Sequence, residues 1–179
     1  MEHCPGCPYR AFGLAIGTRG DPTSRVVLVG EAPGAKEVVE GQPFVGPAGD
    51  VLWRALAEAD LSEADVFVVN SVACRPCNPV KPIRTPSPAA IDACHGRLVR
   101  DIELGPGAVI VALGRTAVQA VTGQRGFPMM KEHGTKRPSI WGPVVPTLHP
   151  AYVLRRGLDG PEYQILVADL KHARRLAGI

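Results

Sequence analysis

The fold class is decided by the stretch RVVLVGEAPG, residues 25–34. Residues 25–29 are mainly apolar and β-branched, and a turn rich in glycine and proline follows them, which predicts a strand. The polarity of this run does not alternate, so both faces of the strand are expected to be buried. A strand of this kind is typical of a parallel sheet enclosed between two layers of helices.

Three further apolar runs resemble the first and lie at residues 66–69, 109–113 and 144–148. Apolar residues recur at helical spacing in four intervening or following segments, at residues 51–59, 88–102, 115–121 and 166–176. Strands and helices therefore alternate along the chain, with right-handed crossovers expected between parallel strands. The predicted fold is α/β, with three α/β/α layers around a central, mostly parallel, four-stranded sheet.

Length and composition are those of one ordinary globular domain, which we expect to span residues 1–179. Apolar residues make up 45% of the chain and charged residues 21%, which excludes disordered and coiled-coil classes. No apolar run approaches the ~20 residues of a membrane-spanning helix, and the start of the chain lacks the pattern of an export signal. We therefore expect a cytoplasmic protein without membrane contacts. The net charge of +3 permits an anionic partner without requiring one.

Chemically versatile side chains follow three of the four predicted strands. Glu31 comes directly after the first strand, Asn70 after the second and His149 after the fourth, while Gly114-Arg115-Thr116 follows the third. Ligands in open α/β sheets bind beyond the carboxyl ends of the strands. A carboxylate, an amide and an imidazole are thus predicted to meet at one edge of the sheet, in a binding or catalytic site.

The five cysteines include two Cys-x-x-Cys pairs, Cys4 with Cys7 and Cys74 with Cys77. In a chain without an export signal, such pairs indicate a metal site rather than disulfides. Four thiolates can hold either a zinc ion or an iron–sulfur cluster, and their spacing alone does not separate the two. Cys94 would be left over in a simple zinc ribbon built from the two pairs alone.

Several motifs resemble those of the family 4 uracil-DNA glycosylases, which are iron–sulfur enzymes of bacteria and archaea. The matching residues span nearly the whole chain and are Gly30-Glu31-Ala32-Pro33-Gly34, Glu37, Gly41, Pro43-Phe44-Val45-Gly46, Ala48-Gly49, Asn70, Cys74-Arg75-Pro76, Arg84-Thr85-Pro86, Ala93-Cys94, residues 112–117 and residues 146–155. The motifs that end at Gly49 and Arg155 are the most specific of these.

The resemblance implies a monofunctional DNA repair enzyme that flips uracil out of DNA and hydrolyses its glycosidic bond, leaving an abasic site. Its partner would be uracil-containing DNA, single or double stranded, bound by a monomer at the bacterial or archaeal nucleoid. Glu31 and His149 match the catalytic positions. His149 would donate a hydrogen bond to the oxygen on which charge develops as the base leaves. Glu31 would either activate water or stabilise the cationic sugar, and the sequence leaves both roles open.

The resemblance also implies a base pocket. Phe44 would stack on the base, and the amide of Asn70 would pair with the adjacent carbonyl and ring N–H of uracil. Gly30 would let the backbone approach the base closely, whereas Ala32 replaces a glycine of some relatives and crowds the pocket near Glu31.

Two residues after His149 are expected to contact DNA. Leu154 would fill the space vacated by the flipped base, on a loop, and core packing is its alternative role. Arg155 is its neighbour in the same motif. The basic residues Lys81, Arg84, Arg97 and Arg100 would face phosphates, or else form an ordinary solvated surface.

For the cysteines, the resemblance implies a [4Fe-4S] cluster held by Cys4, Cys7, Cys74 and Cys94. Cys77 departs from the family pattern, and either Cys74 or Cys77 can supply the third thiolate. The cluster would be structural, because glycosidic hydrolysis transfers no electrons.

Two other functions remain open at this point. One is a uracil-DNA binding protein that traps the base covalently or with little turnover, because some proteins of similar sequence hold uracil-DNA through a histidine on an extended basic loop. The loop at residues 76–86 contains no histidine, although His95 lies just beyond it, and His133 occupies a position where relatives carry a basic residue. The other is a zinc-dependent nucleic-acid module without catalysis.

Overall fold

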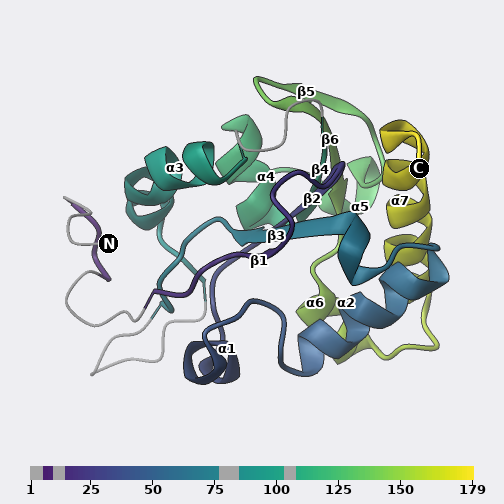
Figure 1. Ribbon diagram of the computed structural model, residues 1–179, viewed down its shortest axis with the longest axis horizontal. Helices are drawn as coiled ribbons and strands as arrows, with labels where there is room; N and C mark the ends of the chain where they lie inside the picture. The colour runs from purple at the N-terminus through teal and green to yellow at the C-terminus, as the bar shows by residue number, and fades with distance from the viewer. Residues whose placement is uncertain (1–5, 10–14, 77–84, 103–107) are drawn as a thin grey trace.

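Six strands form one sheet, in the order β1-β3-β2-β4-β6-β5, in the computed structural model, which describes residues 6–9, 15–76, 85–102 and 108–179 (Figure 1). Four parallel strands make the centre, and a short antiparallel strand lies at each edge. The strands are β1 (Arg19–Gly20), β2 (Val26–Gly30), β3 (Val66–Asn70), β4 (Val109–Leu113), β5 (Arg137–Ser139) and β6 (Gly142–Thr147).

The central strands are buried on both faces, as their unbroken apolar sequences require. Every residue of β2, β3 and β4 is buried, and these strands consist largely of valine, isoleucine and leucine. The predicted α/β fold with a central, mostly parallel sheet is confirmed, but the sheet has six strands rather than four. The two edge strands were not predicted, because β1 has two residues, β5 has three and neither contains an apolar run.

Helices cover both faces of the sheet (Figure 1). Helices α3 (Pro88–Ile102) and α4 (Arg115–Thr122) pack on one face. Helices α2 (Pro47–Glu58) and α7 (Pro161–Ala177) lie on the other face, with α6 (Pro150–Arg156) against them. Two shorter helices, α1 (Ala35–Glu40) and α5 (Met129–Glu132), and the 3-10 turn η1 (Glu63–Asp65) complete the described elements. None of the described helices is both long and apolar enough to span a bilayer.

Helix α6 corrects one expectation, since the residues after His149 form a helix rather than a loop. Pro150 occupies the first helical turn, where its fixed φ angle is favourable and its missing N–H is not needed. The side chain of His149 accepts a hydrogen bond from the backbone N–H of Ala151 and so caps the helix. With seven residues, α6 is too short to show a clear apolar periodicity.

The segment before β2 runs along the free edge of β3. The N–H of Ile16 donates to the carbonyl of Ala73 at 3.0 Å just beyond the end of β3, and Arg19 pairs with Val68 within the strand. Gly20 adopts a φ of +90°, and a Cβ there would lie 2.2 Å from the carbonyl oxygen of Val66. Only glycine therefore allows β1 to lie this close to β3. This arrangement places the Arg19 side chain within hydrogen-bond distance of Glu63 in η1 and of the carbonyl of Pro43.

Candidate active site

The ends of β2 and β3 bring Gly30 and Asn70 side by side, since these residues are register partners in the parallel pair. A Cβ on Gly30 would lie 2.4 Å from Oδ1 of Asn70 and 2.9 Å from the ring of Phe44. The absence of a side chain at Gly30 is therefore what lets the amide and the aromatic ring approach each other. The pairing of β2 with β3 and the glycine at position 30 together form the base of the site.

A cavity of about 360 Å³ opens above this floor. It brings together the predicted residues Ala32, Phe44, Asn70 and His149. The remaining lining comes from α1, from the start of α2 and from the loop residues beside them: Gly34, Ala35, Lys36, Glu37, Gly46, Pro47, Ala48 and Gly49. The cavity has the size of a small-molecule site and combines apolar walls with a few polar groups.

Asn70 provides an unused hydrogen-bond donor in this cavity. The residue is only 3% exposed, and its Nδ2 has no hydrogen-bond partner among the described residues. An unpaired buried amide costs about 1–3 kcal/mol, so it is uncommon without a functional reason. The Asn70 amide is suited to a ligand that presents a carbonyl acceptor to it.

Phe44 and His149 supply two rings to the same cavity. Their ring centroids are 6.1 Å apart, with 34° between the ring planes. Phe44 is 4% exposed, so its ring is fixed by the surrounding protein. A flat aromatic ligand in this cavity would have an apolar face to stack on and an imidazole nearby.

His149 is held as a neutral donor. Its Nδ1 accepts the N–H of Ala151 at 3.1 Å, which places the proton of the neutral ring on Nε2. Burial, together with the positive charge of Arg155, lowers the pKa of His149 to about 4. At neutral pH the imidazole therefore offers an uncharged Nε2–H.

Glu31 lies on a second cavity, of about 380 Å³, and does not line the first. Its carboxylate accepts a hydrogen bond from Oγ1 of Thr116 at 2.6 Å. Burial raises the pKa of Glu31, while the Thr116 hydrogen bond and the charge of Arg155 oppose that rise. His149 lines both cavities and forms the boundary between them. The other residues around the second cavity are Thr85, Gly114, Arg115, Thr116, Met129, Met130, Leu148 and Tyr152.

The end of α6 presents exposed residues beside these cavities. Leu154 is 41% exposed, so the alternative that it packs in the core is wrong. Arg155 is exposed in the last turn of the same helix. An exposed apolar side chain and an exposed cation thus follow one another on the helix that His149 caps.

Arg97 has an internal role that the sequence did not indicate. It pairs with Asp101 at 2.5 Å and donates to the carbonyls of Asn70 and Ser71. Its side chain is 15% exposed, which disagrees with the expected phosphate-facing position. Arg97 instead holds the carboxyl end of β3, which carries Asn70. Arg100 is exposed on α3, whereas Lys81 and Arg84 lie outside the described residues.

The described cysteines lie on three separate segments. Cys7 and Cys74 are half-buried, and Cys94 is buried on α3. Cys74 also forms an isolated antiparallel bridge with Ala15, which ties the segment after Cys7 to the end of β3. Cys4 and Cys77 lie outside the described residues. Within the described part of the chain, no three potential metal ligands converge.

Sequence reasoning found the strand-end residues but missed some of their partners. Thr116 was visible only as part of the turn after the third strand, and no pattern indicated its bond to Glu31. Arg97 stood out only as one charge among several on α3. The contacts that hold the Phe44 loop come from distant segments, and no sequence motif connects them.

Most of the chain is similar to known proteins. The family model of the uracil DNA glycosylase superfamily matches residues 18–171. A type-4 uracil-DNA glycosylase from Thermotoga maritima is 37% identical over 177 residues, which cover 97% of this chain and 89% of the relative. Relatives of the same name from Pyrobaculum aerophilum and Archaeoglobus fulgidus are 34% and 36% identical, over 92% and 89% of this chain and 86% and 80% of their own lengths.

Proposed function

Because the chain belongs to the uracil DNA glycosylase superfamily, we propose that it excises uracil from DNA by hydrolysing the N-glycosidic bond. Its similar relatives are named type-4 uracil-DNA glycosylases, which favours that type over others in the superfamily. The observation that carries the proposal is the unpaired Asn70 amide in a cavity that also holds Phe44 and a neutral His149. The product is an abasic site, and the enzyme acts in base excision repair of DNA.

Base recognition takes place in the first cavity. The target base must leave the helical stack before its glycosidic bond becomes accessible. Phe44 stacks on the flipped base, while Nδ2 of Asn70 donates to a uracil carbonyl and Oδ1 accepts the ring N–H beside it. Cytosine presents an amino group and an unprotonated ring nitrogen at these positions, so the same amide orientation rejects it. Gly30 and Ala32 shape the floor and wall of the pocket around these contacts.

Bond cleavage uses His149, which lines both cavities, and Glu31, which lines the second. The C1′–N1 bond breaks and its electron pair leaves with the base, so negative charge develops on the base oxygens. The Nε2–H of His149 stabilises this charge, an interaction that strengthens in the transition state. Water adds to C1′, and its released proton is finally taken up by the departed base.

Glu31 acts on the deoxyribose or on the water that attacks it. Its carboxylate either accepts the proton of the attacking water or stabilises the positive charge of the sugar. The bond from Thr116 orients the carboxylate and favours its charged form, against the effect of burial. Both roles require the ionised carboxylate, so in either case excision slows as the pH falls through the pKa of Glu31 and when a neutral isostere replaces it.

The cofactor we propose is a structural [4Fe-4S] cluster held by Cys4, Cys7, Cys74 and Cys94, with Cys77 as the alternative third ligand. Thiolates are the usual ligands of such clusters. The burial of Cys94, the partial burial of Cys7 and Cys74 and the Ala15–Cys74 bridge support a group that joins the N-terminal segment to the end of β3, although the three described cysteines do not form a metal-binding group without Cys4. When bound, the cluster would supply a cross-link and no redox step. Iron and sulfide analysis tests it, and zinc without iron would contradict it.

DNA contacts are proposed for α6. The exposed Leu154 would enter the space left by the flipped base, and Arg155 would approach the phosphates. We propose that the protein works as a monomer on uracil-containing DNA. Since the similar relatives come from bacteria and archaea, its site of action would be the nucleoid in the cytoplasm.

The experiment that tests this function uses end-labelled DNA with a single deoxyuridine. After incubation with the protein, denaturing gels are run with and without alkali. Strand cleavage that depends on alkali is expected, because an abasic site is cut only after alkali treatment. Intact strands under both conditions would contradict uracil excision. A protein–DNA band that resists denaturation would indicate covalent trapping, although neither His95 nor His133 lines the base cavity.

A further inference from the structure

The backbone conformation of Phe44 draws attention to residues outside the base cavity that hold its ring in position. This inference rests on the proposed function. Phe44 has a φ of +56°, in the left-handed region, and Asp60 is the only other non-glycine residue with positive φ in the described part of the chain. Bulky side chains are disfavoured in this region, so neighbouring groups must hold the backbone there. The direction of the aromatic ring into the cavity depends on this local backbone.

Side chains bind both peptide groups of Phe44. Its N–H donates to Oε1 of Glu37 at 2.5 Å, and its carbonyl accepts the indole N–H of Trp53 at 2.9 Å. Helix α2 approaches closely at the same point, because a Cβ on Gly49 would lie 2.0 Å from the Phe44 carbonyl oxygen. Trp53 is therefore a hydrogen-bond donor that fixes the Phe44 carbonyl from α2.

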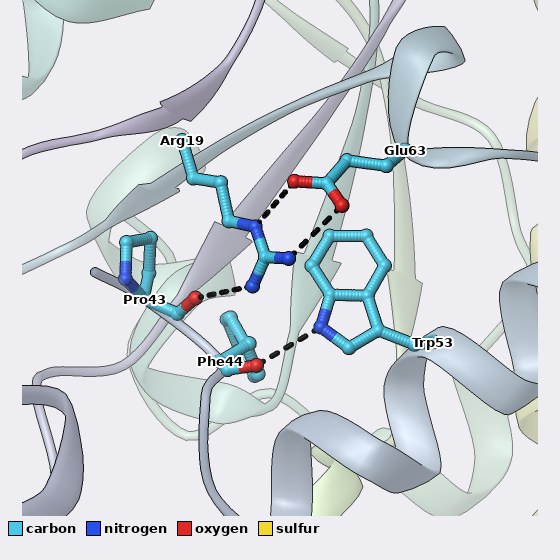
Figure 2. A network of polar contacts seen from close by, with 5 residues as sticks. All are labelled: Arg19, Pro43, Phe44, Trp53 and Glu63. Atoms are coloured by element: carbon cyan, nitrogen blue, oxygen red, sulfur yellow. Dashed lines mark hydrogen bonds and ion pairs between the residues drawn. The ribbon is translucent and has the colours of Figure 1, made fainter. Parts of the chain in front are cut away.

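Arg19 and Glu63 in turn hold the Trp53 side chain in place (Figure 2). The guanidinium of Arg19 lies over the indole ring, 4.3 Å from its centroid. Glu63 accepts two hydrogen bonds from Arg19, at 2.6 and 3.0 Å. Arg19 also donates to the carbonyl of Pro43 at 3.4 Å, directly before Phe44. The Arg19 side chain is 19% exposed, so this contact is partly protected from water.

We propose that Trp53, with Arg19 and Glu63 behind it, is a positioning residue that sets the Phe44 ring for stacking on the base. None of these three side chains lines the base cavity. They come from α2, β1 and η1, and they act through the backbone of Pro43 and Phe44. Loss of the Trp53 donor leaves the Phe44 carbonyl unpaired and lets the left-handed backbone relax. The ring then moves away from its stacking position while the rest of the site stays intact.

The test compares Trp53→Phe, which keeps an aromatic ring for Arg19 but removes the N–H, with Trp141→Phe as the matched control. The chain has two tryptophans, and Trp141 lines a different cavity. Four quantities are measured for each variant: single-turnover excision of uracil, inhibition by free uracil, affinity for DNA with a preformed abasic site, and the thermal unfolding midpoint.

For Trp53→Phe, we expect excision to slow and inhibition by free uracil to weaken by about tenfold each, the usual effect of one lost buried hydrogen bond. Affinity for abasic DNA should stay unchanged, because that ligand has no base for Phe44 to stack on. Arg19→Ala should change uracil inhibition in the same direction and by a smaller factor. Trp141→Phe should match the wild type in all four measurements.

A second readout uses fluorescence. In the Trp141→Phe protein, Trp53 is the single tryptophan, and its indole N–H bonds to the residue that stacks on the base. Saturating free uracil should therefore change the Trp53 emission. Replacing Phe44 with leucine in the same protein should reduce this change, because the stacking contact is lost.

Three results would overturn the inference. The first is uracil inhibition that stays unchanged in both Trp53→Phe and Arg19→Ala. The second is an equal loss of uracil and abasic-DNA binding with a lowered unfolding midpoint, since that pattern means general structural damage. The third is a wild-type protein that neither excises nor binds uracil, which would remove the proposed function as well, whereas the first two occur with an active wild type.

Discussion

The two cavities on either side of His149 are built in different ways. The first is formed around Phe44, Asn70 and His149, with contributions from α1, which include Lys36 and Glu37, and from the start of α2. The second contains the Glu31 carboxylate with Thr116 and Arg115 at the start of α4. The first cavity thus combines an aromatic ring with an unpaired amide, whereas the second contains a buried carboxylate held by a threonine hydroxyl. This difference supports the proposal that base recognition and sugar chemistry take place in separate halves of one site.

The largest effect on the rate of excision is expected in the second cavity, which contains Glu31. Glu31→Gln keeps the shape of the side chain and should slow single-turnover excision by about 10²–10⁴-fold, the range of general acid–base catalysis. Inhibition by free uracil should not change, because Glu31 does not line the base cavity. A parallel loss of uracil inhibition would show that the two halves are not independent. Thr116→Val, which removes the hydrogen bond to Glu31, should act in the same direction with a smaller factor.

His149 lines both cavities, so its replacement should affect both base binding and bond cleavage. His149→Gln should slow excision by about 10²–10³-fold, the usual effect of losing one donor to a developing oxyanion. The pH dependence of stability offers a second measurement. The unfolded chain binds a proton at this histidine near pH 6.5, whereas the folded protein binds it only near a pKa of about 4.

Proton uptake by the unfolded chain lowers the free energy of unfolding as the pH falls from about 6.5 to 4. Denaturant titrations across this range should show a loss of stability in the wild type that is smaller in His149→Gln. Identical pH profiles would contradict a buried neutral imidazole. Measurements at pH 8 serve as the reference, because His149 is then neutral in both states.

A smaller effect on excision is expected from a substitution in the first cavity, where we propose that the base is recognised. Asn70→Ala should reduce excision and weaken uracil inhibition by about 10- to 100-fold, as expected when a bidentate base contact worth about 1–3 kcal/mol is lost. Discrimination between uracil and cytosine should fall with it. Stability should not decrease strongly, because Nδ2 has no partner within the described chain to lose. Unchanged excision would place base recognition elsewhere.

The smallest effect is expected outside both cavities. Leu154→Ala should slow excision from duplex DNA a few-fold and leave excision from single-stranded DNA unchanged, because only a duplex has a stack to refill. The comparison is made with matched oligonucleotides of one sequence. Equal effects on both substrates would mean that Leu154 contributes surface contact rather than insertion.

The fold was largely predictable because each central strand has a local signature. The run at residues 109–113 coincides with β4, and residues 88–102 coincide with α3. The position of functional side chains at strand ends followed from the same reasoning, since parallel strands end at one edge. Their division between two cavities did not follow, because it depends on side-chain packing around His149.

Contacts between distant segments account for what the sequence did not show. Arg19 and Glu63 are 44 positions apart, and Thr116 and Glu31 are 85 apart. Neither pair belongs to a repeating pattern, so only the folded chain brings the partners together. Helix α6 was missed for a different reason, because its start is specified by a cap and a proline rather than by apolar periodicity.

Edge strand β1 has a further consequence for behaviour at high concentration. The fully buried strand β3 would otherwise present its backbone N–H and carbonyl groups at an open edge, which is a template for pairing with other molecules. At the opposite edge, β5 carries Arg137 and Pro138, residue types that discourage such pairing. The two short strands thus terminate the sheet at both sides and protect the folded chain against edge-to-edge aggregation.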